Sequence, residues 1–488
     1  MHTRETLRQQ IRETLHNRMF VVASNREPYI HQHRGPNIAC VRPASGMAVA
    51  LDPVVQASGG LWVAHGSGSA DEEVSDPYGR VRVPPEKPAY TLKRIWLSKE
   101  QEENYYYGFA NSALWPLCHL AYRRPVFHEA HWRAYREVNE IFADAIAAEV
   151  GNHKAFIFVQ DYHLALLPRL LKDRIPQAVV AHFWHIPWPN PEVFRICPWK
   201  HELLAGLLGN DMLGFHIRFD CLNFMETVAS ELEARPDRET TAIVYQGHTT
   251  KIRAFPVSVD FTAIEKLAAS KETVARMSEL RQRYRLPAEN LGVGIDRLDY
   301  TKGIPERIVA IDRFLERYPD YRERFTFLQV SPPSRIHVQE YRALSDEVDR
   351  LVDQVNWRHR SGGWVPIVYV KDHLEQPLLY ALYRMARFCI VSSLHDGMNL
   401  VAKEFVAANV GESGVLLLSQ FTGSARQLHD ALIINPYAAD EVAEQIHAAL
   451  EMESAEVRWR MRRLRESVRD HNIYQWATHV ARRLGRLA

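Results

Sequence analysis

Cationic side chains recur in short polar segments of this sequence, where they could bind phosphate groups. Arg297 and Lys302 lie five residues apart in the segment DRLDYTKG at 296–303. A guanidinium can hold a phosphate through two parallel hydrogen bonds, and an ammonium can add a point charge, so both could converge on one phosphate. Arg26 and Arg335 stand in comparable segments. Each of these residues could equally be a solvated loop charge, and it is their joint recurrence that favours a phosphate site.

A glycine turn leads into an apolar helix pattern in the segment LHDGMNLVAKE, residues 394–404. The first amides of a helix are free of internal partners and carry a partial positive charge, which suits a pyrophosphate. Glu404 lies further along the same pattern and could accept hydrogen bonds from a pair of sugar hydroxyls. The alternative is an ordinary capped helix with a surface glutamate.

Two further segments offer polar side chains that carry no fixed positive charge. They are DYH at 161–163, which begins with Asp161, and HIPWP at 185–189, which begins with His185. The prolines of the second segment fix the direction of the chain after His185. A single histidine in such a place could equally be a structural residue.

Several motifs of other nucleotide and metal enzymes are missing. The segment GSGS at 66–69 lacks the third glycine of a dinucleotide-binding loop, and no GxxxxGK[ST] occurs. There is no DxD pair, and HEAH at 128–131 is not the HExxH zinc motif but resembles a polar helix face. We therefore expect neither a dinucleotide-dependent oxidoreductase nor a P-loop enzyme, and we expect no metal and no other cofactor.

The elements that must position these segments can be recognised from hydrophobic patterning. Ten short apolar runs alternate with stretches of helical length, at 20–24, 155–159, 178–184, 212–216, 291–295, 325–330, 367–370, 388–392, 415–419 and 432–434. Continuous apolar strands separated by helices are typical of parallel sheets covered on both faces, so the predicted fold class is α/β. The polar segments directly follow such runs, and doubly wound sheets bind ligands beyond the carboxyl ends of their strands.

Ten strands are too many for one simple sheet, and the proline-containing segment KIRAFPVSVD at 251–260 interrupts the pattern midway. We expect an N-terminal domain over 1–256 and a C-terminal domain over 257–471. A last helix, 472–488, is expected to cross back to the first domain. The default ligand site is then a cleft between two doubly wound domains.

Composition excludes several classes of partner. The 488 residues include 60 Lys and Arg against 59 Asp and Glu, so no global field attracts nucleic acid or an anionic membrane. The five cysteines are odd in number and widely spaced, which is typical of reduced thiols. No signal peptide and no apolar run of membrane-spanning length is seen. We expect a cytoplasmic protein.

Five longer strings together resemble the trehalose-6-phosphate synthase family, which is glycosyltransferase family 20. They are ALWP at 113–116, DYHL at 161–164, HIPWP at 185–189, RLDYTKG at 297–303 and DGMNLVAKE at 396–404. The resemblance runs from about residue 19 to the C-terminus. It implies the GT-B fold, in which two Rossmann-like domains face each other, with the acceptor bound by 1–256 and the nucleotide sugar by 257–471. It also implies a retaining transfer of glucose from UDP-glucose to glucose-6-phosphate.

The resemblance also implies the site residues. The donor would be held by Gly46 of an N-terminal loop and by Arg297, Lys302, Leu374, Asp396, Gly397, Met398, Asn399, Leu400, Val401 and Glu404. The acceptor would be held by Arg26, Tyr106, Trp115, Asp161 and Arg335. The catalytic residues would be Arg297, Lys302, Asp161 and His185. No carboxylate is an evident nucleophile, so the leaving diphosphate itself would accept the proton of the acceptor hydroxyl on the face from which it departs.

Some positions depart from the family pattern and leave alternatives open. Ser45 replaces a glycine, His395 an arginine and Asp296 a glutamate, while 27–44 is longer than usual. The start REPY at 26–29 resembles glucosylglycerol-phosphate synthases, which use glycerol-3-phosphate. A non-catalytic sugar-nucleotide sensor is an alternative of another class. The expected partners are small-molecule substrates, with a homo-oligomer possible and a separate phosphatase acting on the product.

Overall fold

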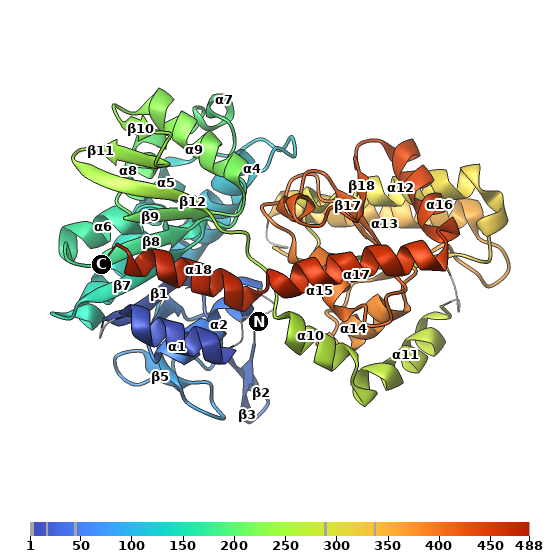
Figure 1. Cartoon of the computed structure of the whole chain (residues 1–488), viewed down its shortest axis with the longest axis horizontal. Coiled ribbons are helices and arrows are strands. Elements are labelled where there is room, and N and C mark those ends of the chain that lie inside the picture. The colour runs from blue at the N-terminus through green and yellow to red at the C-terminus, as the bar shows by residue number, and fades with distance from the viewer. Residues whose placement is uncertain (1–3, 16–17, 43–45, 287–289, 336–337, 488) are drawn as a thin grey trace. The chain divides into compact units, whose positions relative to one another are not determined.

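The computed structural model describes residues 4–15, 18–42, 46–286, 290–335 and 338–487. The chain divides into two compact units (Figure 1). Unit 1 comprises Met1–Val257 together with Ile473–Ala488, and unit 2 comprises Ser258–Asn472. The division therefore falls within the proline-containing segment 251–260, and the chain returns to unit 1 for its last helix.

Unit 1 is built on a ten-stranded sheet with the order β10-β11-β12-β9-β8-β7-β1-β4-β6-β5. Its strands are parallel from β12 through β6, and β5, β10 and β11 are antiparallel. The strands are β1 (Met19–Arg26), β4 (Leu61–His65), β5 (Arg80–Val83), β6 (Tyr90–Ile95), β7 (Ala155–Gln160), β8 (Val179–Phe183), β9 (Met212–Phe215), β10 (Arg235–Asp237), β11 (Ala242–Tyr245) and β12 (His248–Ala254). A separate hairpin pairs β2 (Ile30–Arg34) with β3 (Asn37–Val41).

The helices of unit 1 cover this sheet and include one of unusual type. They are α1 (Arg4–Leu15), α2 (Gly46–Ser58), α3 (Lys99–Glu102), α4 (Trp115–Cys118), α5 (Glu129–Val150), α6 (Leu167–Arg174), α7 (Pro191–Phe194), α8 (Lys200–Leu207), α9 (Arg218–Glu231) and α18 (Ile473–Gly485). The segment η1 (Glu103–Leu114) is a π-helix, a rare form that is frequent at functional sites. A short 3₁₀ helix, η2 (Tyr162–Leu164), follows β7.

The last helix, α18, packs on unit 1 through one apolar face. Trp476, Val480 and Leu484 recur at four-residue spacing, and their side chains are buried. The indole N–H of Trp476 donates a hydrogen bond of 3.1 Å to the carbonyl oxygen of Phe255. The helix lies against α1, so segments from both ends of the chain meet on this unit (Figure 1).

Unit 2 is built on a wholly parallel sheet with the order β15-β14-β13-β16-β17-β18. The strands are β13 (Leu291–Ile295), β14 (Thr326–Val330), β15 (Ile367–Val370), β16 (Phe388–Val391), β17 (Val415–Ser419) and β18 (Leu432–Ile434). Its helices are α10 (Phe261–Ala268), α11 (Lys271–Tyr284), α12 (Ile304–Arg317), α13 (Gln339–His359), α14 (Gln376–Met385), α15 (Leu400–Ala408), α16 (Ala439–Glu451) and α17 (Ser454–Asp470), with 3₁₀ turns η3 (Tyr300–Lys302), η4 (Pro319–Tyr321) and η5 (Gly423–Arg426).

The α/β prediction is confirmed, because each of the ten apolar runs contains a strand that is parallel to its neighbours. The runs are nearly continuous in apolar side chains because helices bury both faces of the sheets. The sequence did not predict β4, β6 or β12, which complete the parallel part of the first sheet. Within the described ranges, no helix is both long enough and apolar enough to cross a membrane.

Candidate active site

In unit 2 the loop after β13 carries the predicted pair Arg297 and Lys302. The loop closes at Gly303, whose φ of +62° is left-handed, and α12 begins with the next residue. A Cβ at this glycine would overlap the carbonyl oxygen of Ser392, at the end of β16. The hydroxyl of Ser392 donates to the carbonyl oxygens of Lys302 and Gly303, at 3.0 and 2.8 Å. Only glycine fits this approach, which fixes the loop against β16.

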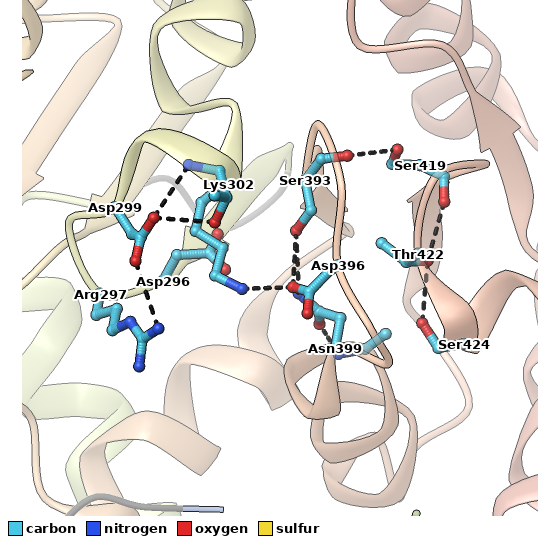
Figure 2. A network of polar contacts seen from close by, with 12 residues as sticks. Asp296, Arg297, Asp299, Lys302, Ser393, Asp396, Asn399, Ser419, Thr422 and Ser424 are labelled. Carbon is cyan, nitrogen blue, oxygen red and sulfur yellow. Dashed lines mark hydrogen bonds and ion pairs between the residues drawn. The ribbon is translucent and has the colours of Figure 1, made fainter. Parts of the chain in front are cut away.

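The side chain of Lys302 forms an ion pair with Asp396, which belongs to the loop after β16 (Figure 2). The same carboxylate oxygen, Oδ2, accepts hydrogen bonds from Ser393 Oγ at 3.2 Å and from Asn399 Nδ2 at 3.3 Å. Two loops that are about a hundred residues apart in sequence are thus joined through one carboxylate, as expected at the carboxyl edge of a parallel sheet.

Asp299 is a second acidic centre in this part of the molecule. Its fully buried carboxylate lies 3.4 Å from the guanidinium of Arg297 and 3.5 Å from that of Arg335. Burial alone would raise the pKa of Asp299, but the positive charges of Arg297, Arg335 and Lys302 outweigh it and hold the pKa well below its usual range. The structure therefore brings three predicted cationic residues of unit 2 around one carboxylate.

Asn399 shapes the start of α15, where a diphosphate was predicted to bind. Its backbone φ is +68°, and its side-chain oxygen accepts a hydrogen bond of 3.1 Å from the amide of Ala402. The first two helical amides, of Leu400 and Val401, precede the amide that this cap satisfies. Gly397 lies close to Gly423, and a Cβ at Gly423 would overlap the carbonyl oxygen of Gly397. Tight backbone packing therefore holds this loop without long side chains.

Glu404 and Leu374 complete the predicted donor residues of unit 2. Burial raises the pKa of Glu404 to about 7. Leu374 is buried between β15 and α14 within the core of unit 2. Met398 is likewise buried, and its carbonyl oxygen accepts from the amide of Ser424 at 2.9 Å.

A buried network beneath this site was not predicted. The guanidinium of Arg307, on α12, donates to Asp296 at 2.7 Å, to Gln329 at 3.0 Å and to Ser392 at 3.0 Å. Its partners come from the loop after β13, from β14 and from the end of β16. Arg307 thus joins neighbouring strand ends beneath the site, and Asp296 is the charged partner that holds it there.

In unit 1, Asp161 follows β7 in a strained conformation. Its φ of +68° and ψ of 171° lie in a region of backbone conformation that residues other than glycine rarely adopt. The carboxylate oxygen Oδ1 accepts from the amides of Tyr162 and His185, at 2.9 and 3.1 Å, and the carbonyl oxygen lies 2.9 Å from His182 Nε2. These contacts tie the ends of β7 and β8 together and make Asp161 and His185 neighbours.

His185 is held as a neutral imidazole. Burial lowers its pKa well below the usual value, and His216, His182 and His163 lower it further. Its Nε2 lies 3.0 Å from Gln160 Oε1, and its own carbonyl oxygen lies 3.1 Å from His216 Nε2. Because the amide nitrogen of Gln160 donates to the carbonyl oxygen of Val159, Oε1 is the acceptor and His185 carries its proton on Nε2.

Arg26 and Tyr106 meet near these residues in unit 1. Arg26, the last residue of β1, donates a hydrogen bond of 2.8 Å to the hydroxyl of Tyr106, which lies on the π-helix. The Tyr106 ring stacks on His163, with 5.5 Å between centroids. Trp115, the residue after the π-helix, is buried, with its ring 5.7 Å from Tyr162. The predicted acceptor residues of unit 1 therefore share one aromatic cluster.

A second buried network that was not predicted begins at the residue after Arg26. This residue, Glu27, pairs with the fully buried guanidinium of Arg94 on β6, at 2.8 Å, and Arg94 also pairs with Asp71 at 2.8 Å. Burial and the hydrogen bond with Asp71 raise the pKa of Glu27 to about 8. The network joins segments far apart in the chain, so no local sequence pattern signals it.

Gly46 and Arg335 are the remaining predicted site residues. Gly46 is the first residue of α2, and Ser45 and the two residues before it lie outside the described part of the chain. Arg335, predicted to contact the acceptor, lies in unit 2 beside Arg297, with its φ at +51°. Among the described residues no group of three or more His, Cys, Asp or Glu side chains could hold a metal ion.

The sequence profile of glycosyltransferase family 20 matches residues 17–486 of the chain. The chain belongs to this family. A curated trehalose-6-phosphate synthase of Mycolicibacterium vanbaalenii is 35% identical over 466 residues, covering 94% of each chain. This family 20 glycosyltransferase has the GT-B fold, with two Rossmann-like units.

Solved structures support the same assignment. An E. coli protein, solved with UDP-2-fluoro glucose bound, matches with a TM-score of 0.85 at 30% identity, over 96% of this chain and 99% of that one. An α,α-trehalose-phosphate synthase (UDP-forming) from Burkholderia xenovorans, solved in complex with glucose-6-phosphate, matches with the same TM-score, identity and coverage.

Proposed function

We propose that this glycosyltransferase transfers glucose from UDP-glucose to glucose-6-phosphate, with retention of configuration, and forms α,α-trehalose 6-phosphate and UDP. The observation that carries the proposal is the gathering of Arg297, Lys302 and Arg335 around Asp299 and Asp396 at the carboxyl edge of the second sheet. The ligands of the E. coli and Burkholderia xenovorans relatives support the choice of donor and acceptor.

On the donor side, the diphosphate would replace the carboxylates as partner of the cations. Lys302 and Arg297 would bind its oxygens, and the first amides of α15, those of Leu400 and Val401, would add a partial positive charge. The carboxylate of Glu404 would accept from the ribose hydroxyls. Asp396, released from Lys302, would be available to a hydroxyl of the transferred glucose.

On the acceptor side, Arg26 and the Tyr106 hydroxyl would bind the phosphate of glucose-6-phosphate. Asp161 would accept from a sugar hydroxyl, and Trp115 would shape the pocket. His185 is a neutral imidazole with its proton on Nε2, so Nδ1 could accept a further hydroxyl hydrogen bond. The role of Arg335 with the same phosphate stays a prediction.

In the transfer step, the bond between the glucose C1 atom and the diphosphate oxygen breaks, and a bond from C1 to the acceptor oxygen forms on the same face. The proton of the acceptor hydroxyl passes to the departing diphosphate oxygen. Arg297 and Lys302 stabilise the charge that develops on this diphosphate, so catalysis rests on positioning and electrostatics. We propose that the cations of the chain perform this role without a metal ion.

The test measures UDP release by the purified protein from UDP-glucose, with glucose-6-phosphate, with glycerol-3-phosphate or with no acceptor, and with or without EDTA. We expect release that needs glucose-6-phosphate and is indifferent to EDTA, and an α,α-linked product by NMR. If release occurs with glycerol-3-phosphate but not with glucose-6-phosphate, the acceptor is glycerol-3-phosphate and the proposal is wrong on this point. Loss of release in EDTA would refute the metal-independent mechanism. No release with either acceptor would favour the sensor. The phosphorylated product would need a separate phosphatase to yield the free disaccharide.

A further inference from the structure

A cationic concavity lies on unit 1 between α18 and the end of β12. It has a volume of about 310 Å³ and is lined by Arg253, Ala254, Phe255, His479, Arg482, Arg483 and Arg486. The four residues at 479, 482, 483 and 486 have the spacing of one helical face and are exposed. The lining thus contains four arginines and a histidine but no acidic residue, although the whole chain carries a net charge of only +1.

The arginines of this concavity lack the acidic partners that other helical arginines have. On α17, Arg460, Arg462 and Arg463 each form an ion pair with a carboxylate. Among the described residues, Arg253, Arg482, Arg483 and Arg486 form no ion pair. Arg482 donates to the neutral amide oxygen of Gln10, at 3.1 Å. Within the part of unit 1 that the structure describes, no carboxylate therefore pairs with the arginines of this cluster.

Arg253 shows that the charges face one another. One nitrogen of its guanidinium, Nη1, donates to the carbonyl oxygens of Thr240, Thr241 and Ile252, at 3.1, 3.0 and 2.8 Å, which anchors the side chain. Burial lowers the pKa of Arg253, and the nearby charge of Arg483 lowers it further. Basic residues often complement the end of a helix dipole, but that preference does not account for an arginine on a neighbouring strand.

The walls of the concavity are fixed by the fold. Phe255 is buried, and its carbonyl oxygen accepts a hydrogen bond from the indole N–H of Trp476 on α18. The Trp476 ring lies 5.4 Å from that of Phe183, whose ring lies 4.7 Å from His185. A ligand would therefore meet arginines on a rigid frame, which lowers the entropic cost of binding.

We propose that this concavity binds a small phosphate-bearing anion, at a site separate from the proposed substrate-binding residues. Several guanidinium groups around one hollow match the oxygens of a phosphate or diphosphate group, which they can bind through paired hydrogen bonds. A membrane or a nucleic acid would need a flat or extended basic surface, whereas these arginines line a hollow of limited volume. The bound anion would join α18 to β12.

Hydrogen exchange measured by mass spectrometry tests the proposal. The protein is measured with inorganic phosphate, pyrophosphate or glucose-6-phosphate, at constant ionic strength. We expect at least one of these anions to slow exchange in 250–256 and 473–487, and their ranking identifies the preferred anion. In the double variant Arg483→Gln/Arg486→Gln, the anion concentration needed for half-maximal protection should rise by about tenfold or more per arginine removed. The variant Lys302→Gln should keep it, which separates this site from the proposed donor site.

The variant Arg133→Gln/Arg136→Gln removes the same charge from two exposed arginines of α5 and should bind as the parent does. If the first double variant unfolds at a lower temperature than the parent, Arg483→Lys/Arg486→Lys serves in its place. This variant keeps the charge but loses the paired hydrogen bonds, so we still expect a weaker affinity for the anion. Equal protection in all variants would overturn the proposal. Absence of protection at millimolar concentrations of all three anions would also overturn it, as would binding of RNA or anionic vesicles alone.

Discussion

Lys302 and Asp396 illustrate how single residues prepare the candidate site. Their ion pair holds both side chains in place within unit 2, and Asp396 is held further by Ser393 and Asn399 (Figure 2). A phosphate that binds Lys302 has to compete with this carboxylate. The pair therefore keeps the ammonium oriented until a more highly charged ligand takes its place.

Replacement of Lys302 by methionine should lower kcat/KM by roughly a hundredfold to a thousandfold, because one charge that stabilises the leaving diphosphate is lost. Steady-state kinetics with both substrates would measure the effect. The matched control is Lys371→Met, which removes a half-exposed lysine of unit 2 that pairs with Asp349. An equal loss in the control would show that net charge, rather than position, matters.

Glu404 should make both stability and donor binding depend on pH. Its folded pKa is raised to about 7 from an ordinary value of 4.5, so the folded chain binds this proton more tightly than the unfolded chain does. The stability that results is fully present below about pH 4.5 and is lost as the pH rises through 7. Urea unfolding across this range should show a smaller loss in Glu404→Gln than in the parent, because the raised pKa of Glu27 still contributes in both.

Donor binding should follow the opposite trend, because ribose hydroxyls donate to the carboxylate and not to the acid. The KM for the donor should fall as the pH rises through about 7. The variant Glu404→Gln should have a KM that is higher and independent of pH over the same range. A pH profile shared by the parent and the variant would exclude Glu404 as the group responsible.

At the scale of elements, the turn at Gly303 fixes how the loop after β13 meets the end of β16. We expect Gly303→Ala to destabilise the protein by about 1–3 kcal/mol, because the left-handed φ and the overlap with Ser392 both oppose a side chain. Gly362→Ala is the matched control, since Gly362 has φ +53° but open space around it. Urea unfolding of both variants separates the overlap from the cost of the backbone conformation. Equal losses would show that the close approach contributes nothing.

The sequence predicted the elements well where they are apolar throughout. The runs at 291–295 and 415–419 are strands with those bounds, because burial on both faces leaves no polar interruption. The sequence did not predict β6, YTLKRI, because the basic residues of this strand interrupt the apolar pattern. Arg94 is nevertheless buried, where it pairs with two carboxylates. Arg297 and Lys302 both lower the pKa of Asp299, a central carboxylate for which the sequence predicted no role in the site. Contacts of this kind depend on pairing between distant segments.

At the scale of the whole molecule, unit 1 depends on the last helix of the chain. Replacement of the buried Trp476 by alanine should lower its free energy of unfolding by about 3–5 kcal/mol, because a large cavity and an unpaired carbonyl result. Hydrogen exchange should accelerate in β7 and β8 but not in β13 and β14. The control Trp459→Ala removes a half-exposed tryptophan of unit 2 and should change neither. Equal acceleration in β13 would show that the two units unfold together.

The return of α18 to unit 1 also has a consequence for synthesis on the ribosome. The strands of unit 1 leave the exit tunnel first, but the helix that covers Phe158 and Phe183 is translated only after the whole of unit 2. Nascent domains generally fold in order from the N-terminus. In this chain the first unit to emerge is the last to be completed, because the apolar side chains that α18 covers have no cover until the end of translation.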